Sequence, residues 1–237
     1  MATIETLLFD FGGTLDADGV AWKERFHALY QAEGLHMTAD EFAPAFYAAD
    51  DPLAAALPST AGLAETVHAL AASLEAELAR RAGAAKARAD GDRGRRVAAR
   101  FLADMSAIFS RNRPVLETLT KRYPLGVVSN FYGNLEAVCR SAGLSPLFKV
   151  MTDSRRVGAE KPDPAIFRAA LDELRAGPET ALYIGDSLRR DCEGARRAGM
   201  GFVWIAPESV QAAERTGAPG PILAAVTRLP DLPEVLK

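Results

Sequence analysis

Cysteine is scarce in this sequence, and the two residues present are placed unlike a metal site. Among 237 residues only Cys139 and Cys192 are cysteine. They lie in stretches with helical patterns and lack the paired spacing of metal-binding cysteines. We therefore expect two free thiols, buried or half-buried, rather than a disulfide, as is usual in a reducing compartment.

Long hydrophobic runs are absent as well. No apolar stretch approaches the roughly 20 residues needed to cross a bilayer, so no membrane partner is expected. The first five residues, Met1 to Glu5, lack the positive start of a secretory signal, and the compartment that the sequence predicts is the cytoplasm.

The chain has no large excess of either charge. Its formal net charge of -3 gives no general attraction to nucleic acid or to an anionic membrane. Basic residues do gather in one stretch, and we interpret it as a solvated helix pair joined around Gly91 and Gly94. A surface that attracts an anionic substrate or partner is the alternative, although no base-stacking aromatic residue lies nearby to favour nucleic acid. The basic residues are Arg80, Arg81, Lys86, Arg88, Arg93, Arg95, Arg96 and Arg100.

Short apolar runs alternate with helical patterns over much of the chain. The runs that predict strands cover residues 4–9, 125–128, 149–152, 181–184 and 202–205. The patterns that predict helices cover residues 114–122, 135–142, 164–174 and 188–198. This alternation favours an α/β fold, with a parallel sheet covered by helices on both faces. Such sheets bind ligands at the carboxyl ends of their strands, where Asp10, Ser129 and Asp186 all fall, so we expect these residues to converge.

One long interval breaks the alternation. Between residues 16 and 109 apolar side chains recur at helical spacing, and Phe42 and Phe46 indicate a further short helix. We therefore predict a core domain of residues 1–15 and 110–237 with a helical domain, residues 16–109, inserted after the first strand. The helical stripes are Trp22, Phe26, Leu29 and Tyr30; Leu63, Val67, Leu70, Leu74 and Leu78; and Val97, Phe101, Met105 and Ile108. Residues 207–221 are expected to form a surface loop with one helical turn, and residues 223–235 to close the core.

Four motifs follow one another in a recognisable order. They are Asp10-Phe11-Gly12-Gly13-Thr14, Val127-Val128-Ser129-Asn130, Glu160-Lys161-Pro162-Asp163-Pro164, and Ile184-Gly185-Asp186-Ser187 with Asp191 beyond. Together they resemble the haloacid dehalogenase (HAD) superfamily, in the subfamily that carries a helical cap after the first motif. The resemblance covers most of the chain and implies a Rossmann-like core, a cap and a hydrolase.

The resemblance also implies catalytic roles for four residues. Asp10 would be the nucleophile that attacks phosphorus and becomes an aspartyl phosphate. Ser129 and Asn130 would contact the phosphoryl group of the substrate. The ammonium group of Lys161 would bind the substrate and neutralise charge on the nucleophile and on the transferring group.

A magnesium site is implied by the same resemblance. Asp10, Asp186 and the backbone carbonyl of Gly12 would bind Mg²⁺, which prefers carboxylates, waters and phosphate oxygens in octahedral geometry. Asp191 would bind a metal-ligated water or orient Lys161, and a plain surface role for Asp191 is the alternative.

Gly12 departs from the pattern of the family's phosphatases, which usually carry a second aspartate there. That aspartate protonates the leaving oxygen and then activates water, and general acid–base help of this kind is worth roughly 10²–10⁴-fold. Because glycine does neither, we expect weak activity on ordinary alkyl phosphates. A leaving group of low pKa, as in an acyl phosphate, an aryl phosphate or a phosphoanhydride, needs little protonation.

Other groups near the start of the cap are possible substitutes for the missing acid. Asp16, Asp18, His27 and His36 are all titratable, but each is interpreted more readily as an ordinary loop or cap residue. Relatives that cleave carbon–phosphorus bonds have alanine at the position of Gly12 and use a cap lysine as a Schiff base. Lys23 is the lysine at the start of this cap, and we interpret it as a solvated helix residue.

Three hypotheses remain after this reading. The leading one is a Mg²⁺-dependent phosphohydrolase of weak or specialised activity on a small phosphorylated metabolite. The second is a noncatalytic homologue that binds phosphate and metal. The third is a carbon-centred hydrolase of the 2-haloacid dehalogenase type, whose members work without metal and carry tyrosine at the position of Gly12. A monomer and a homodimer both fit the sequence.

Overall fold

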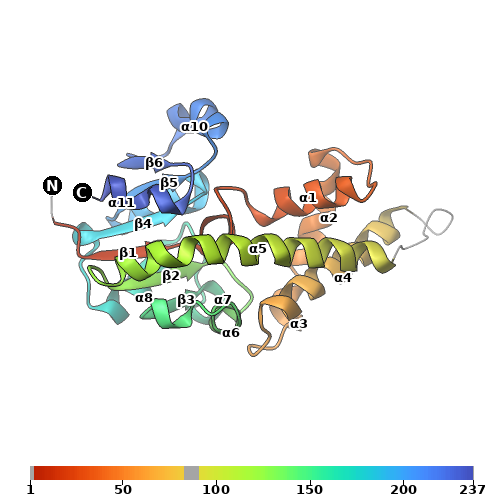
Figure 1. Cartoon of the computed structure of the whole chain (residues 1–237), viewed down its shortest axis with the longest axis horizontal. Coiled ribbons are helices and arrows are strands. Elements are labelled where there is room, and N and C mark those ends of the chain that lie inside the picture. Colours follow the sequence, from red (N-terminus) through yellow and green to blue (C-terminus); the bar gives the residue numbers. More distant parts are fainter. Residues whose placement is uncertain (1–2, 83–90, 237) are drawn as a thin grey trace.

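A parallel β-sheet forms one end of the molecule (Figure 1). The structure is a computed structural model that describes residues 3–82 and 91–236, and within these residues six strands lie in the order β3-β2-β1-β4-β5-β6. Each neighbouring pair is parallel, as predicted. The strands are β1 (Thr6–Phe9), β2 (Leu125–Ser129), β3 (Val150–Asp153), β4 (Ala181–Gly185), β5 (Gly201–Ile205) and β6 (Ala224–Val226).

Strand β1 lies in the middle of the sheet, and all four of its residues are buried. Leu7 and Phe9 pack into the apolar cluster on one face, and Leu8 packs into the cluster on the other. Successive side chains of a strand point to opposite faces, so a strand buried on both faces is mostly apolar, and Thr6 at its start is the one polar residue of β1. The continuous apolar run that ends before Asp10 is therefore explained by its central place.

Helices cover both faces of the sheet. Leu116 and Leu119 of α5 belong to the cluster around Leu7, whereas Ile166 and Phe167 of α8 belong to the cluster around Leu8. The helices are α1 (Trp22–Ala32), α2 (Ala39–Asp50), α3 (Leu53–Ala56), α4 (Leu63–Ala82), α5 (Gly91–Leu119), α6 (Leu135–Ser141), α7 (Ser154–Val157), α8 (Pro164–Leu174), α9 (Glu193–Ala198), α10 (Glu208–Glu214) and α11 (Leu232–Val235). Shorter helical turns are η1 (Phe11–Leu15), η2 (Ser145–Leu147), η3 (Pro178–Thr180), η4 (Leu188–Cys192), η5 (Arg215–Gly217) and η6 (Leu229–Asp231).

The interval after β1 folds as a helical bundle, which we call the cap. It consists of α1 to α4 and the first part of α5, with α4 packed along both α2 and α5 (Figure 1). The short helix predicted around Phe42 and Phe46 is α2. It begins with a capping box, in which the Thr38 hydroxyl accepts from Glu41 N at 3.3 Å and the Glu41 carboxylate accepts from Thr38 N at 2.8 Å.

Helix α5 corrects one expectation. The prediction of a separate helix over residues 114–122 is wrong, because α5 runs without a break from Gly91 to Leu119, through Pro114. The buried positions Phe109, Asn112, Leu116 and Leu119 continue one helical face past the proline, so packing against the core maintains the helix there. The predicted domain boundary between residues 109 and 110 lies inside this helix, and a division at that point stays a prediction.

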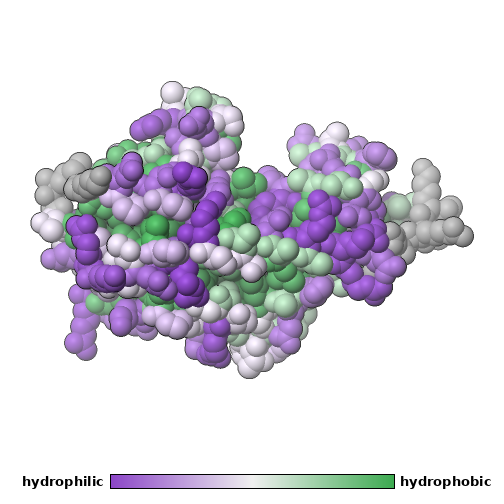
Figure 2. All heavy atoms as spheres, in the orientation of Figure 1, coloured by the Kyte–Doolittle hydropathy of each residue, from purple (hydrophilic) through white to green (hydrophobic). Residues whose placement is uncertain are grey.

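The basic stretch forms ion pairs at the outer end of the cap, where Figure 2 shows hydrophilic side chains crowded together. Lys86 and Arg88 lie outside the described residues. The described arginines and their partners are Arg80 and Arg81 with Glu77, Arg93 with Glu75, Arg95 with Asp92, and Arg96 and Arg100 with Glu33. Each of these arginines thus has an acidic partner, as expected of solvated helices, but the predicted joint around Gly91 and Gly94 is wrong, because both glycines lie at the start of α5.

Other sequence expectations concern the rest of the core. Cys139 and Cys192 are free and buried, as expected, and burial raises the pKa of Cys139 to about 12. Residues 207–221 contain α10 and η5, which is more helix than the one turn expected, and β6 and α11 follow them. None of the helices within the described ranges has the length and apolarity that crossing a membrane requires.

Candidate active site

Asp10 occupies the end of the central strand. Its backbone N–H donates to Ile184 O at 2.9 Å, which holds the ends of β1 and β4 together. One carboxylate oxygen, Oδ1, accepts from three donors: Phe11 N at 2.7 Å, Ser129 Oγ at 2.8 Å and Lys161 Nζ at 2.7 Å. Within the described part of the chain no hydrogen bond reaches Oδ2. The side chain is therefore fixed by one oxygen, and the other is available to a ligand.

Lys161 is a buried ammonium group held by three oxygens. Besides Asp10, its Nζ contacts Asp191 Oδ1 at 2.8 Å and Tyr183 Oη at 3.0 Å. Tyr183 in turn donates to Val128 O at 2.7 Å, which fixes the phenol between β4 and β2. Burial alone would lower the pKa of Lys161, but the carboxylates of Asp10 and Asp191 outweigh this effect and raise it. The lysine therefore stays charged beside the carboxylate of Asp10.

The side chain of Asn130 is engaged by the backbone of Lys161. Its Oδ1 accepts from Lys161 N at 2.7 Å, and its Nδ2 donates to Lys161 O at 3.2 Å. Asn130 thus positions the lysine. The predicted contact between Asn130 and the substrate stays a prediction. Because both polar atoms of its side chain are engaged, the backbone of Asn130 would have to make that contact.

Three carboxylates meet below the cavity. One oxygen each from Asp10, Asp186 and Asp191 lies within 4.8 Å of the others. Removal from water and the nearby carboxylates of Asp191 and Asp10 raise the pKa of Asp186 well above its usual value. Both oxygens of Asp191 are already occupied, by Lys161 and by Ser187 N at 2.9 Å. Hard oxygen ligands in a crowded acidic cluster fit Mg²⁺, which Asp10 and Asp186 would hold directly, with Asp191 behind them.

Gly13 is required for the approach of the two motifs. Its φ is +91°, a conformation that side chains rarely adopt. A Cβ on Gly13 would lie 2.5 Å from Asp186 Oδ2, which is closer than any real contact. Thr14, the next residue, donates its hydroxyl to Asp186 Oδ1 at 3.2 Å. The Gly-Thr step therefore brings the last motif against the first.

Gly12, by contrast, has a conformation open to any residue, with φ -75° and ψ 121°. A Cβ there would lie 3.3 Å from the indole nitrogen of Trp22, Nε1, and 3.4 Å from its Cδ1. The edge of the Trp22 indole thus lies where a side chain at position 12 would begin. The backbone allows an acid at this position, but the packing around it leaves little room.

Asp16 holds that indole in place. Its carboxylate accepts from Trp22 Nε1 at 2.7 Å, from Gly13 N at 2.7 Å and from Arg25 Nη1 at 2.9 Å. Asp16 is fully buried, and burial raises its pKa despite the neighbouring Arg25. Its oxygens are therefore engaged in supporting the loop, and Asp16 is a poor substitute for the missing acid.

The remaining candidate acids are also placed elsewhere. Asp18 pairs with both terminal nitrogens of Arg111, at 2.6 and 2.8 Å. The ring Nε2 of His27 lies 2.8 Å from Met37 O, and His36 is exposed. The described residues that line the cavity do not include Asp16, Asp18, His27 or His36. The structure thus offers no support for proton transfer by these groups.

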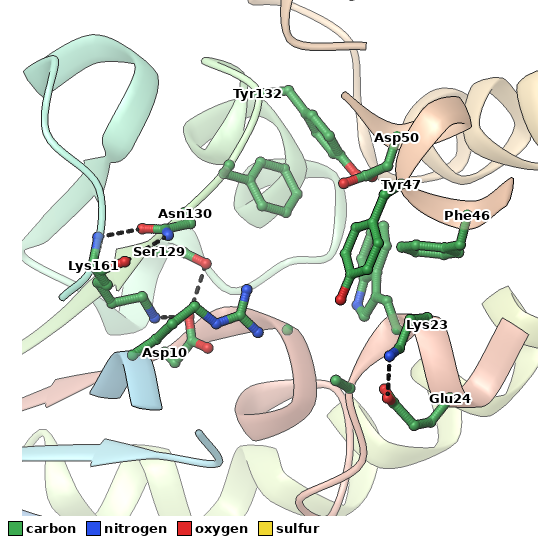
Figure 3. Close-up of a pocket in the computed structure, with 15 residues that line it drawn as sticks. Asp10, Lys23, Glu24, Phe46, Tyr47, Asp50, Ser129, Asn130, Tyr132 and Lys161 are labelled. Carbon is green, nitrogen blue, oxygen red and sulfur yellow. Dashed lines mark hydrogen bonds and ion pairs between the residues drawn. The ribbon is translucent and has the colours of Figure 1, made fainter. Parts of the chain in front are cut away.

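A cavity of about 180 Å³ opens above Asp10, between the core and the cap. Side chains from the two parts face one another across it, as Figure 3 shows. Tyr132, after β2, donates its hydroxyl to Asp50 at the end of α2, and so joins core and cap at the edge of the cavity. The cap side chains labelled in Figure 3 are Lys23, Glu24, Phe46, Tyr47 and Asp50.

Lys23 differs from its interpretation as a solvated helix residue. It lines the cavity, with 28% of its side chain exposed, and its Nζ lies 5.5 Å from the ring centre of Tyr47 and 3.2 Å from Glu24. Partial burial would lower the pKa of Lys23, but Glu24 and Tyr47 raise it overall. A Schiff-base lysine needs a neutral amine, so this environment does not favour carbon–phosphorus cleavage.

Residues 4–199 match the sequence model of the haloacid dehalogenase-like hydrolases. The chain belongs to this family. Among solved structures, the HAD-hydrolase YfnB of Bacillus subtilis, bound to magnesium, has a TM-score of 0.55 at 21% identity, with 99% of each chain covered. This likeness confirms the Rossmann-like core with an inserted cap.

Curated relatives match part of this HAD hydrolase. Haloacid dehalogenase-like hydrolase domain-containing protein 3 of Bos taurus is 40% identical over 96 residues, 40% of this chain and 38% of the relative. Phosphoserine phosphatase of Thermus thermophilus is 44% identical over 64 residues, 27% of this chain and 26% of the phosphatase. The matched stretches therefore span well under half of these relatives.

The site of this HAD hydrolase is only partly visible in its sequence. The structure brings together Asp10, Ser129, Lys161, Asp186 and Asp191, as the motifs predict. Sequence reasoning missed several residues that complete the site. They are Tyr183 beside the lysine, and Tyr47, Asp50 and Arg190 around the cavity. Only Arg190 had a signal in the sequence, because it directly precedes Asp191 of the fourth motif. The cap residues Tyr47 and Asp50 lie in no motif.

Proposed function

We propose that this HAD hydrolase is a Mg²⁺-dependent phosphohydrolase that acts through an aspartyl phosphate on a small phosphorylated compound. The observation that carries the proposal is the single cluster formed by Asp10, Lys161 and Asp186 at the floor of the cavity. The Thermus relative is a phosphatase, and the Bacillus structure binds magnesium. Both relatives support this reaction class and this metal.

Phosphoryl transfer to Asp10 is the first step. The free Oδ2 would attack phosphorus, and the bond from phosphorus to the leaving oxygen would break with its electron pair on that oxygen. The Ser129 hydroxyl and the Lys161 ammonium, now 2.8 and 2.7 Å from Oδ1, would hold the phosphoryl oxygens or the nucleophile. Fixed donors of this kind stabilise charge that develops in the transition state.

The acidic cluster would provide the metal site. Mg²⁺ held by Asp10, Asp186 and the Gly12 carbonyl would neutralise the charge of the phosphoryl oxygens. Asp191 would keep Lys161 in position while that charge develops, because its Oδ1 accepts from the ammonium at 2.8 Å. Cap closure over the cavity would exclude bulk water.

Gly12 determines which substrates this site could process. No acid at position 12 protonates the departing oxygen, and the side chains of Asp16 and Asp18 are engaged elsewhere. A leaving group of low pKa would depart without help, which favours acyl phosphates, aryl phosphates and phosphoanhydrides. The second step, attack of water on the aspartyl phosphate, would also lack a base. We therefore expect the phosphoenzyme to accumulate.

A burst experiment tests the proposal. Mixed rapidly with p-nitrophenyl phosphate and Mg²⁺, the enzyme should release about one equivalent of nitrophenolate per site and then turn over slowly. Asp10→Asn should abolish both phases, whereas Asp18→Asn, the matched control, should keep them. Absence of any Mg²⁺-dependent release from aryl and acyl phosphates would contradict the proposal. Halide release from a 2-haloacid without metal would identify the carbon-centred alternative instead.

A noncatalytic role is the second candidate, and the Trp22 indole beside Gly12 favours it. The ring crowds the place where an acid would begin, yet the groups that would bind phosphate and metal are all retained. A chain of this kind would bind phosphate and Mg²⁺ and act by association. In that case Asp10→Asn would preserve function in cells, and wild-type protein would show no burst.

A further inference from the structure

The charges around the cavity are not evenly paired. Its lining includes three cations and three carboxylates, and each carboxylate has a partner. Asp10 pairs with Lys161, Glu24 pairs with Lys23, and Asp50 accepts a hydrogen bond from Tyr132. The third cation is Arg190, and within residues 3–82 and 91–236 no hydrogen bond or ion pair engages its guanidinium group.

Arg190 comes from the core and stands next to cap residues. It lies on η4, one residue before Asp191, and remains exposed to solvent. Partial loss of water would lower its pKa, but the carboxylates of Asp191, Asp10 and Asp186, and the Tyr47 phenol, raise it. The guanidinium group therefore stays charged.

Tyr47 and Lys23, both from the cap, line the same cavity as this arginine. The ring of Tyr47 lies 5.5 Å from Lys23 Nζ. Two cations and a phenol, from α1, α2 and η4, thus line the same cavity (Figure 3 labels the two cap residues). The phosphoryl group has its own donors, Ser129 and Lys161, which both contact Asp10 Oδ1.

We infer that this second group binds another anionic group of the same substrate, a carboxylate or a second phosphate, with Arg190 as the main contact. A guanidinium group suits both anions, because its fork of N–H donors matches their paired oxygens. The cavity of about 180 Å³ is smaller than the roughly 300–1,000 Å³ of pockets for drug-sized ligands, so the substrate is compact. The inference rests on the proposed function for the position of the phosphoryl group.

Contacts on both sides of the cavity would also draw the cap and the core together. Lys23 and Tyr47 belong to the cap and Arg190 to the core, so an anion between them bridges the two parts. Glu24, which lies 3.2 Å from Lys23, partly neutralises the lysine. We therefore expect Arg190 to contribute more than Lys23, and we expect removal of the Glu24 charge to strengthen binding.

Binding of phosphonates tests the inference without turnover, because their carbon–phosphorus bonds do not hydrolyse at this site. The probes are propylphosphonate, 3-phosphonopropionate and propane-1,3-diphosphonate, titrated by calorimetry at saturating Mg²⁺. The first has one anionic group, and the others carry a carboxylate or a second phosphonate on the same chain. At least one of the latter two should bind about 10- to 100-fold more tightly than propylphosphonate, the range expected for a hydrogen bond between charged groups.

Variants identify the residues responsible. Arg190→Gln should remove the preference, measured as the ratio of the affinity for a two-anion probe to that for propylphosphonate, while Arg189→Gln, on the same turn but outside the cavity lining, should preserve this ratio. Glu24→Gln should strengthen the preference by about 2- to 5-fold, as expected for an exposed pair.

Two results would overturn the inference. One is equal affinity of the wild-type protein for all three probes, and the other is an equal loss for all three in Arg190→Gln, which would assign this arginine to the phosphoryl group itself. The two-anion probe that binds more tightly shows whether the second anionic group of the substrate is a carboxylate or a phosphate. Hydrolysis of p-nitrophenyl phosphate is measured separately, so a failure of the proposed function is distinguished from a failure of this inference.

Discussion

Restoring an acid at position 12 should require a second substitution, at Trp22. The backbone at Gly12 accepts any residue, but a Cβ there would lie 3.3 Å from Trp22 Nε1. The indole is held by its 2.7 Å hydrogen bond to Asp16 and by an edge contact with Phe101 at 5.3 Å between ring centres. Gly12→Asp alone must therefore displace a fixed ring by a few tenths of an ångström or turn its carboxylate away from the substrate.

Trp22→Phe removes Nε1, the indole atom nearest to the new Cβ, and with it the hydrogen bond to Asp16 that holds the ring, so the smaller ring is freer to move aside. It also leaves Asp16 with two donors in place of three, Gly13 N and Arg25. A lost hydrogen bond to a charged group costs about 1.5–3 kcal/mol, which a folded domain of this size should tolerate. In the double variant, Gly12→Asp/Trp22→Phe, general acid–base catalysis should raise turnover of an alkyl phosphate by about 10²-fold, the low end of its usual range.

The assay compares matched pairs on one background. Steady-state hydrolysis of an alkyl phosphate is measured for Trp22→Phe, for Gly12→Asp/Trp22→Phe, and for Gly12→Asn/Trp22→Phe, which has the same shape without a proton to give. The Asp variant should exceed the Asn variant by about 10²-fold, and Gly12→Asp alone should gain much less. The nitrophenolate burst should merge into the steady state, because the new carboxylate would also activate water.

Either of two results would refute this reasoning. If Gly12→Asp alone matches the double variant, the indole does not block position 12. If the Asp and Asn variants are equally active, the missing proton transfer is not what limits the site, and the retained groups serve another chemistry or none.

Three further predictions concern the buried Lys161, the metal site and Glu193. Lys161→Met leaves the carboxylates of Asp10 and Asp191 without their buried cation, so it should lower the free energy of unfolding in urea by about 3–5 kcal/mol without metal and by less at saturating Mg²⁺. Mg²⁺ at 100 times its Kd should stabilise the wild type by about 2.7 kcal/mol, and a thermal scan should show no such gain for Asp186→Asn. Arg196 and Arg197 lower the pKa of the partly buried Glu193 to about 2, so its contribution to stability is complete above the ordinary pKa near 4.5 and is lost as the pH falls toward 2. Between pH 5 and pH 3 the wild type should therefore lose more stability in urea than Glu193→Gln does, with Glu173→Gln on α8 as the control; equal losses in wild type and Glu193→Gln would contradict this assignment.

Much of the core could be predicted because each signal is local and physically forced. A strand buried on both faces is mostly apolar, so the run before Asp10 was interpretable without knowledge of its neighbours. Pro164 begins α8 as predicted, with the Asp163 carboxylate accepting from Ala165 N at 2.9 Å. Pro114 was misread for the same reason: proline is typical of helix starts, but here the packing of Leu116 and Leu119 carries the helix through it.

The site was predictable only where residues stand in motifs. Asp10 and Asp186 were expected to meet because both follow parallel strands, and the sheet order places β1 beside β4. The contact between Trp22 and Gly12 has no such signal, because it depends on how the first cap helix returns over the loop. Lys23 was misinterpreted for that reason too, since helical periodicity says which face is polar and not what that face meets.

Gly12 and the second anion site that we infer affect different terms of catalysis. The missing acid–base group costs about 3–5 kcal/mol in the transition state when the leaving oxygen must be protonated. Contacts of Arg190 with a remote anion would strengthen binding, but they raise the rate only if they are stronger in the transition state than in the bound substrate. Tighter binding alone cannot replace the lost proton transfer. If the protein is an enzyme, its substrate must therefore bring its own good leaving group, and the second anion would select among such compounds rather than accelerate the reaction.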